Sequence, residues 1–231
     1  MKMNAIYYKV FPALAVVAGF CSGCVTEQKE SGAVMLENYV NQYIWPAESL
    51  QIRDYSASDD YLCIYIEGEP VYSDSGPQFD EFAAQYGDTS YNRKGIPGQY
   101  PVVYGAVTSI DVVCEDDFCG YPAGSSLNEI AVLETSSPYW FIQSGYDRDK
   151  YDSRPKDEEL RDGYYGYYHT RIICSELVPG ELFMVDPECW LNFLKTPEGG
   201  GRYRFTVTLG IEGKEVTGSS YQYFIKNTQW D

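Results

Sequence analysis

The sequence is short of histidine and of basic residues, and both shortages exclude functions. Its 231 residues include one histidine, His169, and 17 Lys and Arg against 34 Asp and Glu, which gives a formal net charge of −17. A chain this acidic repels phosphate backbones, so we expect no nucleic-acid partner. The same charge argues against a basic face that lies on anionic lipid.

The motifs of common catalytic sites are also missing. The chain contains no Gly-x-Ser-x-Gly, no His-Glu-x-x-His and no glycine-rich phosphate-binding loop. His169 stands among tyrosines, where a lone histidine is more often structural than catalytic. Acidic residues are so abundant that no carboxylate pair for glycoside hydrolysis stands out, and a glycan-active hydrolase is a remote alternative. We predict a protein that is not an enzyme and has no cofactor.

The apolar run from Phe11 to Phe20 is too short to cross a bilayer, which takes about 20 residues. Lys2 and Lys9 precede this uncharged run, and small residues and Cys24 follow it. A positive start, an apolar middle and a small-residue end form the pattern of a secretory signal peptide.

The residues Ser22-Gly23-Cys24 resemble the bacterial lipobox, in which small residues precede a lipidated cysteine; Cys21 stands where lipoboxes usually carry leucine. The resemblance implies that residues 1–23 are a lipoprotein signal peptide and that Cys24 carries acyl chains, several of which anchor a protein stably. Residues 24–32 then form a lipidated tether. We expect a lipid anchor in the outer membrane of a bacterial envelope, with the surface and periplasmic leaflets both open.

An odd number of cysteines follows Cys24, so at least one thiol stays unpaired or bonds another chain. In an oxidising compartment the candidate disulfides are Cys114–Cys119 and Cys174–Cys189. A zinc site made from Cys114, Cys119, Cys174 and His169 matches no standard ligand spacing, so we predict no metal site.

Alternating apolar residues predict a β-rich domain over residues 33–231, with a sub-boundary placed in the loop 87–100. The clearest hairpin has apolar residues at every second position from Tyr203 to Ile211, a Glu212-Gly213 turn and a return strand to about Ile225. Further strands are predicted at residues 61–66, 101–107, 110–114, 139–142, 171–174 and 181–185.

Three short helices are predicted between the strands. Pro77 begins the first, whose apolar residues recur at helical spacing before Gly87. Ser126 and Glu129 form a capping box for a second. A third opens at residues 186–188 with Trp190, Phe193 and Leu194 on its inner face, and residues 33–44 are either a helix or an edge strand.

The segment 122–128, which follows a predicted strand, and the hairpin from Arg202 to Lys214 resemble lipoproteins of unknown function from gut Bacteroidota. The resemblance covers roughly residues 100–226 and implies an immunoglobulin-like sandwich behind a lipid tether, with no catalytic residues to transfer. Independently, many short strands with turn signals predict a mostly β fold, an antiparallel β-sandwich with a few short helices.

Aromatic side chains are the best candidates for a ligand site, because the chain has 23 Tyr and 4 Trp and such rings offer sugars an apolar face and a polar tip. The candidate ligand-binding residues are Tyr165, Tyr167, Trp140 and Trp45. The alternative is that most of these rings fill the core or edge of the sandwich.

We therefore predict a membrane-anchored, non-catalytic binding or interaction module whose ligand is a glycan or an envelope protein. The alternative is a structural or assembly lipoprotein, such as a pilus-like subunit or a scaffold, that polymerises by strand addition with residues 33–44 as the exchanged strand.

Overall fold

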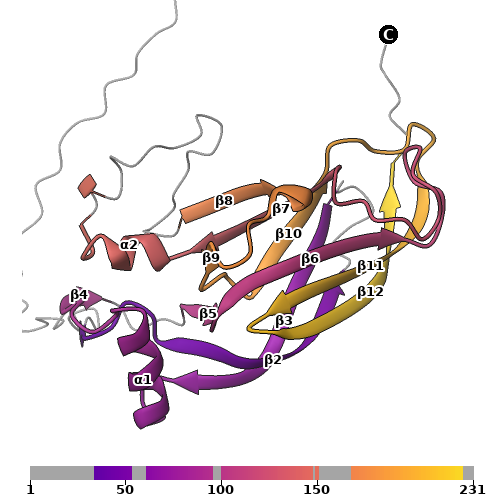
Figure 1. Ribbon diagram of the computed structural model, residues 1–231. Helices are drawn as coiled ribbons and strands as arrows, with labels where there is room; N and C mark the ends of the chain where they lie inside the picture. The colour runs from indigo at the N-terminus through magenta and orange to yellow at the C-terminus, as the bar shows by residue number, and fades with distance from the viewer. Residues whose placement is uncertain (1–33, 54–60, 96–99, 148, 151–167, 226–231) are drawn as a thin grey trace, which may run out of the picture. The chain divides into compact units, whose positions relative to one another are not determined.

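The chain is mostly β, and two sheets enclose its main core in the computed structural model, which describes residues 34–53, 61–95, 100–147, 149–150 and 168–225 (Figure 1). The larger sheet contains, in spatial order, β5 (Pro101–Val103), β2 (Gln42–Arg53), β3 (Tyr61–Tyr72), β10 (Glu188–Phe193), β7 (Ala131–Ser137) and β8 (Tyr168–Ile173). The smaller sheet contains β12 (Lys214–Phe224), β11 (Gly201–Ile211), β6 (Ala106–Cys114) and β9 (Leu182–Phe183).

Neighbouring strands are antiparallel except for β2 and β5, which run parallel. This arrangement confirms the predicted mostly β fold with antiparallel sheets, while its immunoglobulin-like character stays a prediction. A separate strand pair joins β1 (Val34–Leu36) to β4 (Arg93–Gly95). Residues 33–44 therefore hold a short strand and the start of β2, which lies between β5 and β3. Among the described residues, no helix is long and apolar enough to cross a membrane.

The β11–β12 hairpin confirms the sequence prediction at its turn and along its register. Gly201 pairs with Phe224 at the open end, and Ile211 pairs with Lys214 beside the turn. Phe205, Val207 and Leu209 are buried and face the other sheet, as strict alternation requires. The hairpin supplies one wall of the main hydrophobic core.

Two predicted helices are wrong, and in each case pairing with distant residues decides the structure. Residues 188–193 form β10, which is hydrogen-bonded between β3 and β7 in the middle of the larger sheet. The apolar residues of this segment fit a helix face, but two neighbouring strands satisfy the backbone of an extended chain instead.

The capping-box prediction fails because its two side chains have other partners. The Ser126 hydroxyl donates to Asp111 at 2.6 Å, and Glu129 accepts from the Tyr121 hydroxyl at 3.1 Å. Residues 126–130 are a turn that leads directly into β7.

The strand predicted at residues 139–142 is instead the helix α2 (Tyr139–Gln143). Pro138 precedes it, and proline cannot donate to a strand ladder. The Pro138 carbonyl accepts from the Ile142 amide at 3.0 Å, which closes a helical turn. A second difference is at Gly105, whose φ of 106° ends β5 and lets β6 run unbroken through residues 108–109.

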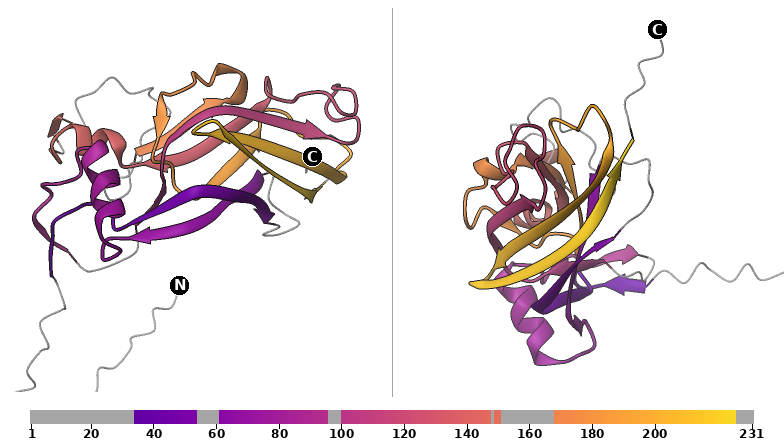
Figure 2. Two further views of the ribbon diagram at one scale, coloured as in Figure 1. Left: turned by 60° about the horizontal axis from the view of Figure 1, so that its bottom comes forward. Right: turned by 90° about the vertical axis from the view of Figure 1, so that its right-hand side faces the viewer.

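A second core, rich in aromatic residues, lies where α1 (Pro77–Gln85) and α2 cover one end of the molecule (Figure 2). The predicted first helix is thus confirmed, with Phe79 and Phe82 buried. The rings of Tyr39, Tyr43, Tyr86 and Tyr146 belong to the same cluster.

Asp88 is wholly buried at the centre of this aromatic core. Its carboxylate accepts the amides of Tyr39 and Val40 at 2.8 Å each and the Tyr146 hydroxyl at 2.8 Å. Burial raises the pKa of Asp88 above its ordinary value, and the two backbone hydrogen bonds oppose that rise. The carboxylate therefore ties together three segments that are distant in sequence.

Replacing Asp88 with alanine is expected to lower the free energy of unfolding by about 2–4 kcal/mol, because three buried donors lose their acceptor. Chemical denaturation measures this loss, with Asp74→Ala, at an exposed turn, as the control.

Since the pKa of Asp88 is raised in the folded state, the stability of the natural chain relative to Asp88→Asn should fall as pH rises through that pKa. A natural chain that gains stability over Asp88→Asn in that pH range contradicts the assignment.

Candidate functional site

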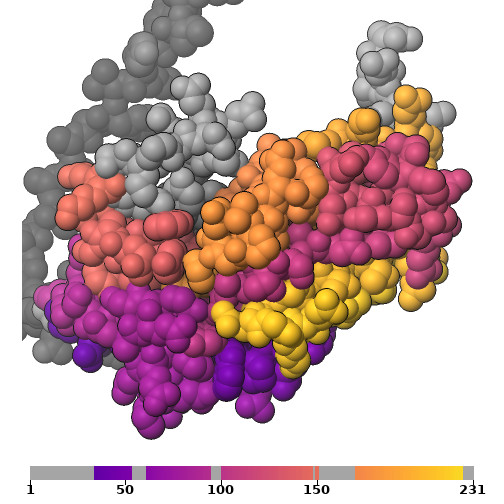
Figure 3. Space-filling model, viewed as in Figure 1, coloured from indigo at the N-terminus to yellow at the C-terminus, as the bar shows by residue number. Residues whose placement is uncertain are grey.

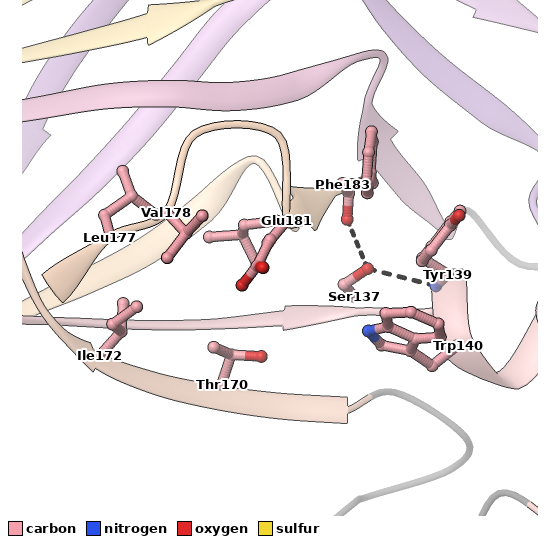
Figure 4. Close-up of a pocket in the computed structure, with 10 residues that line it drawn as sticks. Ser137, Tyr139, Trp140, Thr170, Ile172, Leu177, Val178, Glu181 and Phe183 are labelled. Atoms are coloured by element: carbon pink, nitrogen blue, oxygen red, sulfur yellow. Dashed lines mark hydrogen bonds between the residues drawn. The ribbon is translucent and has the colours of Figure 1, made fainter.

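A pocket of about 210 Å³ lies between β8 and β9, each of which is one of the two outer strands of its sheet. Figure 4 shows the Trp140 indole at one end of the pocket and Leu177, Val178 and Ile172 at the other, with Thr170 and Glu181 between them. The remaining lining residues are Ser137, Tyr139, Leu182 and Phe183.

The pocket forms because the chain leaves the larger sheet at Ser137. The Ser137 hydroxyl donates to the Phe183 carbonyl at 2.5 Å and accepts the Tyr139 amide at 3.2 Å. These bonds link the end of β7, the start of α2 and β9. Trp140, on the first turn of α2, consequently stands at the rim with 43% of its surface exposed.

The other rim is a tight turn at residues 178–181. The Glu181 amide donates to the Val178 carbonyl at 3.2 Å, and Gly180 has a φ of 81°, which favours glycine. The turn follows the short helix η2 (Cys174–Glu176) and exposes half of Val178. An apolar side chain and a carboxylate thus share one rim.

The structure separates the two tryptophans predicted as ligand residues. Trp45 is exposed outside the pocket, where its ring lies against Phe82 at 5.5 Å and Tyr104 at 6.2 Å between centroids. Trp140 lies 5.0 Å from the Tyr139 ring, and a chain of ring contacts through Tyr139, Tyr86 and Tyr104 joins the two tryptophans. Only Trp140 lines the pocket.

Tyr165 and Tyr167, the other two candidates, lie outside the described residues. Sequence reasoning missed Thr170, Val178 and Glu181. No signal in the sequence marks Glu181, because it is one of 34 acidic residues.

The pocket offers hydrogen bonds and apolar contact but no catalytic pair. Glu181 is the single carboxylate among the ten lining residues, which include no histidine or cysteine. The Ser137 hydroxyl is already engaged at both its donor and acceptor sides. Within the described part of the chain, no three His, Cys, Asp or Glu side chains are grouped to hold a metal ion.

Comparison with protein-family models, with curated proteins and with solved structures yields no match to this chain.

Cys114, Cys119, Cys174 and Cys189 all have free thiols, so the two predicted disulfides are wrong in this structure. Ile173 is level with Asn192 two strands away. Across the sheet, Cys174 and Cys189 are thus separated by two strand spacings of about 4.8 Å each, and along the strands by at least three residues of about 3.4 Å each. A disulfide requires Cα atoms within about 7 Å of each other, so these two cysteines are too far apart to form one. In the other pair Cys114 is buried, whereas Cys119 lies in a turn with its thiol 3.5 Å from the Lys195 carbonyl.

Cys119 is expected to react first with a thiol reagent in the native protein, because it alone of the five cysteines after Cys24 is partly exposed. Burial raises the pKa of both Cys174 and Cys189 to about 12, which further suppresses their thiolate forms. Peptide mapping after brief alkylation at pH 8 measures the order of labelling.

Cys119→Ser should remove this rapid label, and Cys189→Ser should leave it unchanged. Equal labelling of Cys119 and Cys189 before denaturation would contradict the packing described here.

Proposed function

We propose that this protein is a lipid-anchored, non-catalytic binding module of a bacterial envelope, and that it holds one ring of a glycan in the Trp140 pocket. The observation that carries the proposal is the exposed indole of Trp140 at the rim of a hollow that also contains Glu181 and Thr170.

The dimensions of the pocket favour a single ring. Its volume of about 210 Å³ is below the range of about 300–1,000 Å³ that accommodates drug-sized ligands. A sugar ring has an apolar face of C–H groups that can lie against an indole. The opposite rim, formed by Val178 and Leu177, extends the apolar contact.

The polar groups of the pocket suit hydroxyls. A carboxylate such as that of Glu181 accepts charge-assisted hydrogen bonds, and the Thr170 hydroxyl both donates and accepts. The net charge of −17 repels polyanions, so the ligand we propose is uncharged. A binding role also accords with a pocket that contains a single carboxylate, since glycoside hydrolysis normally uses two.

Attachment to the membrane rests on the lipobox resemblance around Cys24. An acylated Cys24 followed by the polar residues 25–32 would hold the sandwich close to the bilayer. A binding module in that position retains its ligand at the envelope.

A second candidate function is assembly by strand addition. The observation that favours it is that β8 and β9, which border the pocket, are both outer strands of their sheets. An extended peptide could pair with such an edge and place side chains in the hollow. The Trp140 ring favours the glycan, and the experiment below distinguishes the two.

Trp140→Ala is expected to weaken glycan binding by about tenfold or more, because a stacking surface at the rim is lost. A glycan array with the detergent-solubilised chain identifies the ligand, and isothermal titration measures its affinity. Trp140→Phe should retain part of the affinity.

Trp45→Ala is the matched control, since Trp45 is also exposed but lies outside the pocket. If no glycan binds while light scattering detects ordered oligomers, the assembly function replaces the glycan function. Equal losses for the two tryptophan variants would remove the pocket from the proposal.

Cys24→Ser is expected to abolish incorporation of an alkyne-labelled fatty acid into the protein expressed in a bacterial host, because serine lacks the thiol that receives lipid. Cys21→Ser is the control and should still be labelled. In-gel fluorescence of the two variants measures the result. Labelling that survives Cys24→Ser would refute the anchor.

A further inference from the structure

The outward side of the β11–β12 hairpin carries large exposed side chains where a solvated strand normally carries polar ones. Tyr221 and Tyr223 point outward on β12 and are 45% and 52% exposed, and Ile225 follows them with 57% exposed. Gln222 and Phe224, between them, are buried. We call this outward side the hairpin face; it comprises Arg202, Arg204, Thr206, Thr208, Thr217, Ser219, Tyr221 and Tyr223.

Two arginines of β11 organise the aromatic end of the hairpin face. The Arg202 guanidinium lies over the Tyr221 ring, 3.8 Å from its centroid. Arg204 lies 5.8 Å from the same centroid and forms an ion pair with Glu115 at 2.8 Å. Among the described residues, no carboxylate lies within ion-pairing distance of Arg202, so its N–H groups have capacity for a ligand.

The other end of the hairpin face is a ladder of hydroxyls. Thr206 and Ser219 are hydrogen-bonded across the strands at 2.7 Å, and Thr208 and Thr217 at 3.0 Å. Each hydroxyl of such a pair keeps further donor or acceptor capacity. In the space-filling view, the hairpin and β6 lie side by side on one face of the molecule (Figure 3).

We propose that the hairpin face is a second ligand site, which binds an extended, uncharged polysaccharide chain. The distance from Thr217 to Tyr223 is six residues of about 3.4 Å, or about 20 Å, which suits several linked sugars rather than one ring. The Tyr223 ring provides a stacking surface, Arg202 donates hydrogen bonds, and the hydroxyl ladder exchanges hydrogen bonds with sugar hydroxyls.

The net negative charge of the protein favours an uncharged polysaccharide as the ligand. Arg204 is neutralised by Glu115, and the chain as a whole carries −17. A polyanion would gain one contact at Arg202 but meet repulsion from the rest of the surface, whereas a neutral polymer meets none.

A protein partner fits the hairpin face less well. The cores of protein interfaces are more apolar than the rest of the surface, whereas four of the eight residues of the hairpin face are Thr or Ser.

This second site is independent of the pocket. The spatial order β12-β11-β6-β9 puts the hairpin at one side of the smaller sheet and the pocket at the other, beside β9. Variants can therefore test each site separately.

The test is native affinity electrophoresis of the full chain in non-ionic detergent, through gels that contain xylan, mixed-linkage glucan, galactomannan or polygalacturonate. At least one of the three neutral polysaccharides should retard the natural chain. Tyr223→Ala should weaken that retardation about five- to tenfold and Arg202→Gln about threefold, whereas Trp140→Ala should leave it intact.

Two variants serve as matched controls. Tyr72→Ala removes an exposed tyrosine of β3, and Lys214→Gln removes a cation at the far end of β12; neither should change retardation, and thermal melts should show all variants folded. The proposal is overturned if no neutral polysaccharide retards the chain, if polygalacturonate retards it most, or if Tyr223→Ala behaves as Tyr72→Ala does. Loss of retardation in Trp140→Ala alone would assign all the binding to the pocket.

Discussion

The position of the pocket depends on a carboxylate that does not line it. Asp88 accepts the Tyr146 hydroxyl, and the Tyr146 amide in turn donates to the Phe141 carbonyl of α2 at 3.0 Å. Two residues further along the same helix, the Gln143 side chain donates to the Tyr86 carbonyl at 2.7 Å. Since α2 spans only five residues, it has little stability of its own. These tertiary bonds hold the helix in place, and with it Trp140.

The pocket and the aromatic core therefore share the helix α2, whose outer face lines the pocket and whose inner face packs in the core. Ser137 ends β7, Pro138 turns the chain into α2, and the buried side chains of Phe141 and Ile142 fix the inner face of the helix. Trp140 faces outward because it lies between residues that must face inward. Helical geometry sets this exposure, and a strand over the same residues would have put Trp140 and Ile142 on one face.

The sequence predicts well where its own pattern is unambiguous. Strict alternation through Tyr203–Ile211 and the Glu212-Gly213 turn define the β11–β12 hairpin, and Pro77 and Gly87 bound α1. It predicts poorly where partners distant in the chain decide the conformation. Trp190 is an example, because the helix-like spacing of its segment is overridden by pairing with β3 and β7. The turn after η2 brings Glu181 to the pocket. The sequence does not predict this position, because it depends on how that turn packs against distant parts of the chain.

The two faces of the hairpin show how one strand can serve stability and recognition together. Period-two alternation commits Val216, Gln222 and Phe224 to the interior, where they are buried against the other sheet. The positions between them are free of that demand, so polar residues there would suffice for folding. Tyr221 and Tyr223 instead expose rings that contribute little to the core. The Tyr221 ring lies under the Arg202 guanidinium, whereas the Tyr223 ring is the stacking surface for the uncharged ligand that we propose for this face.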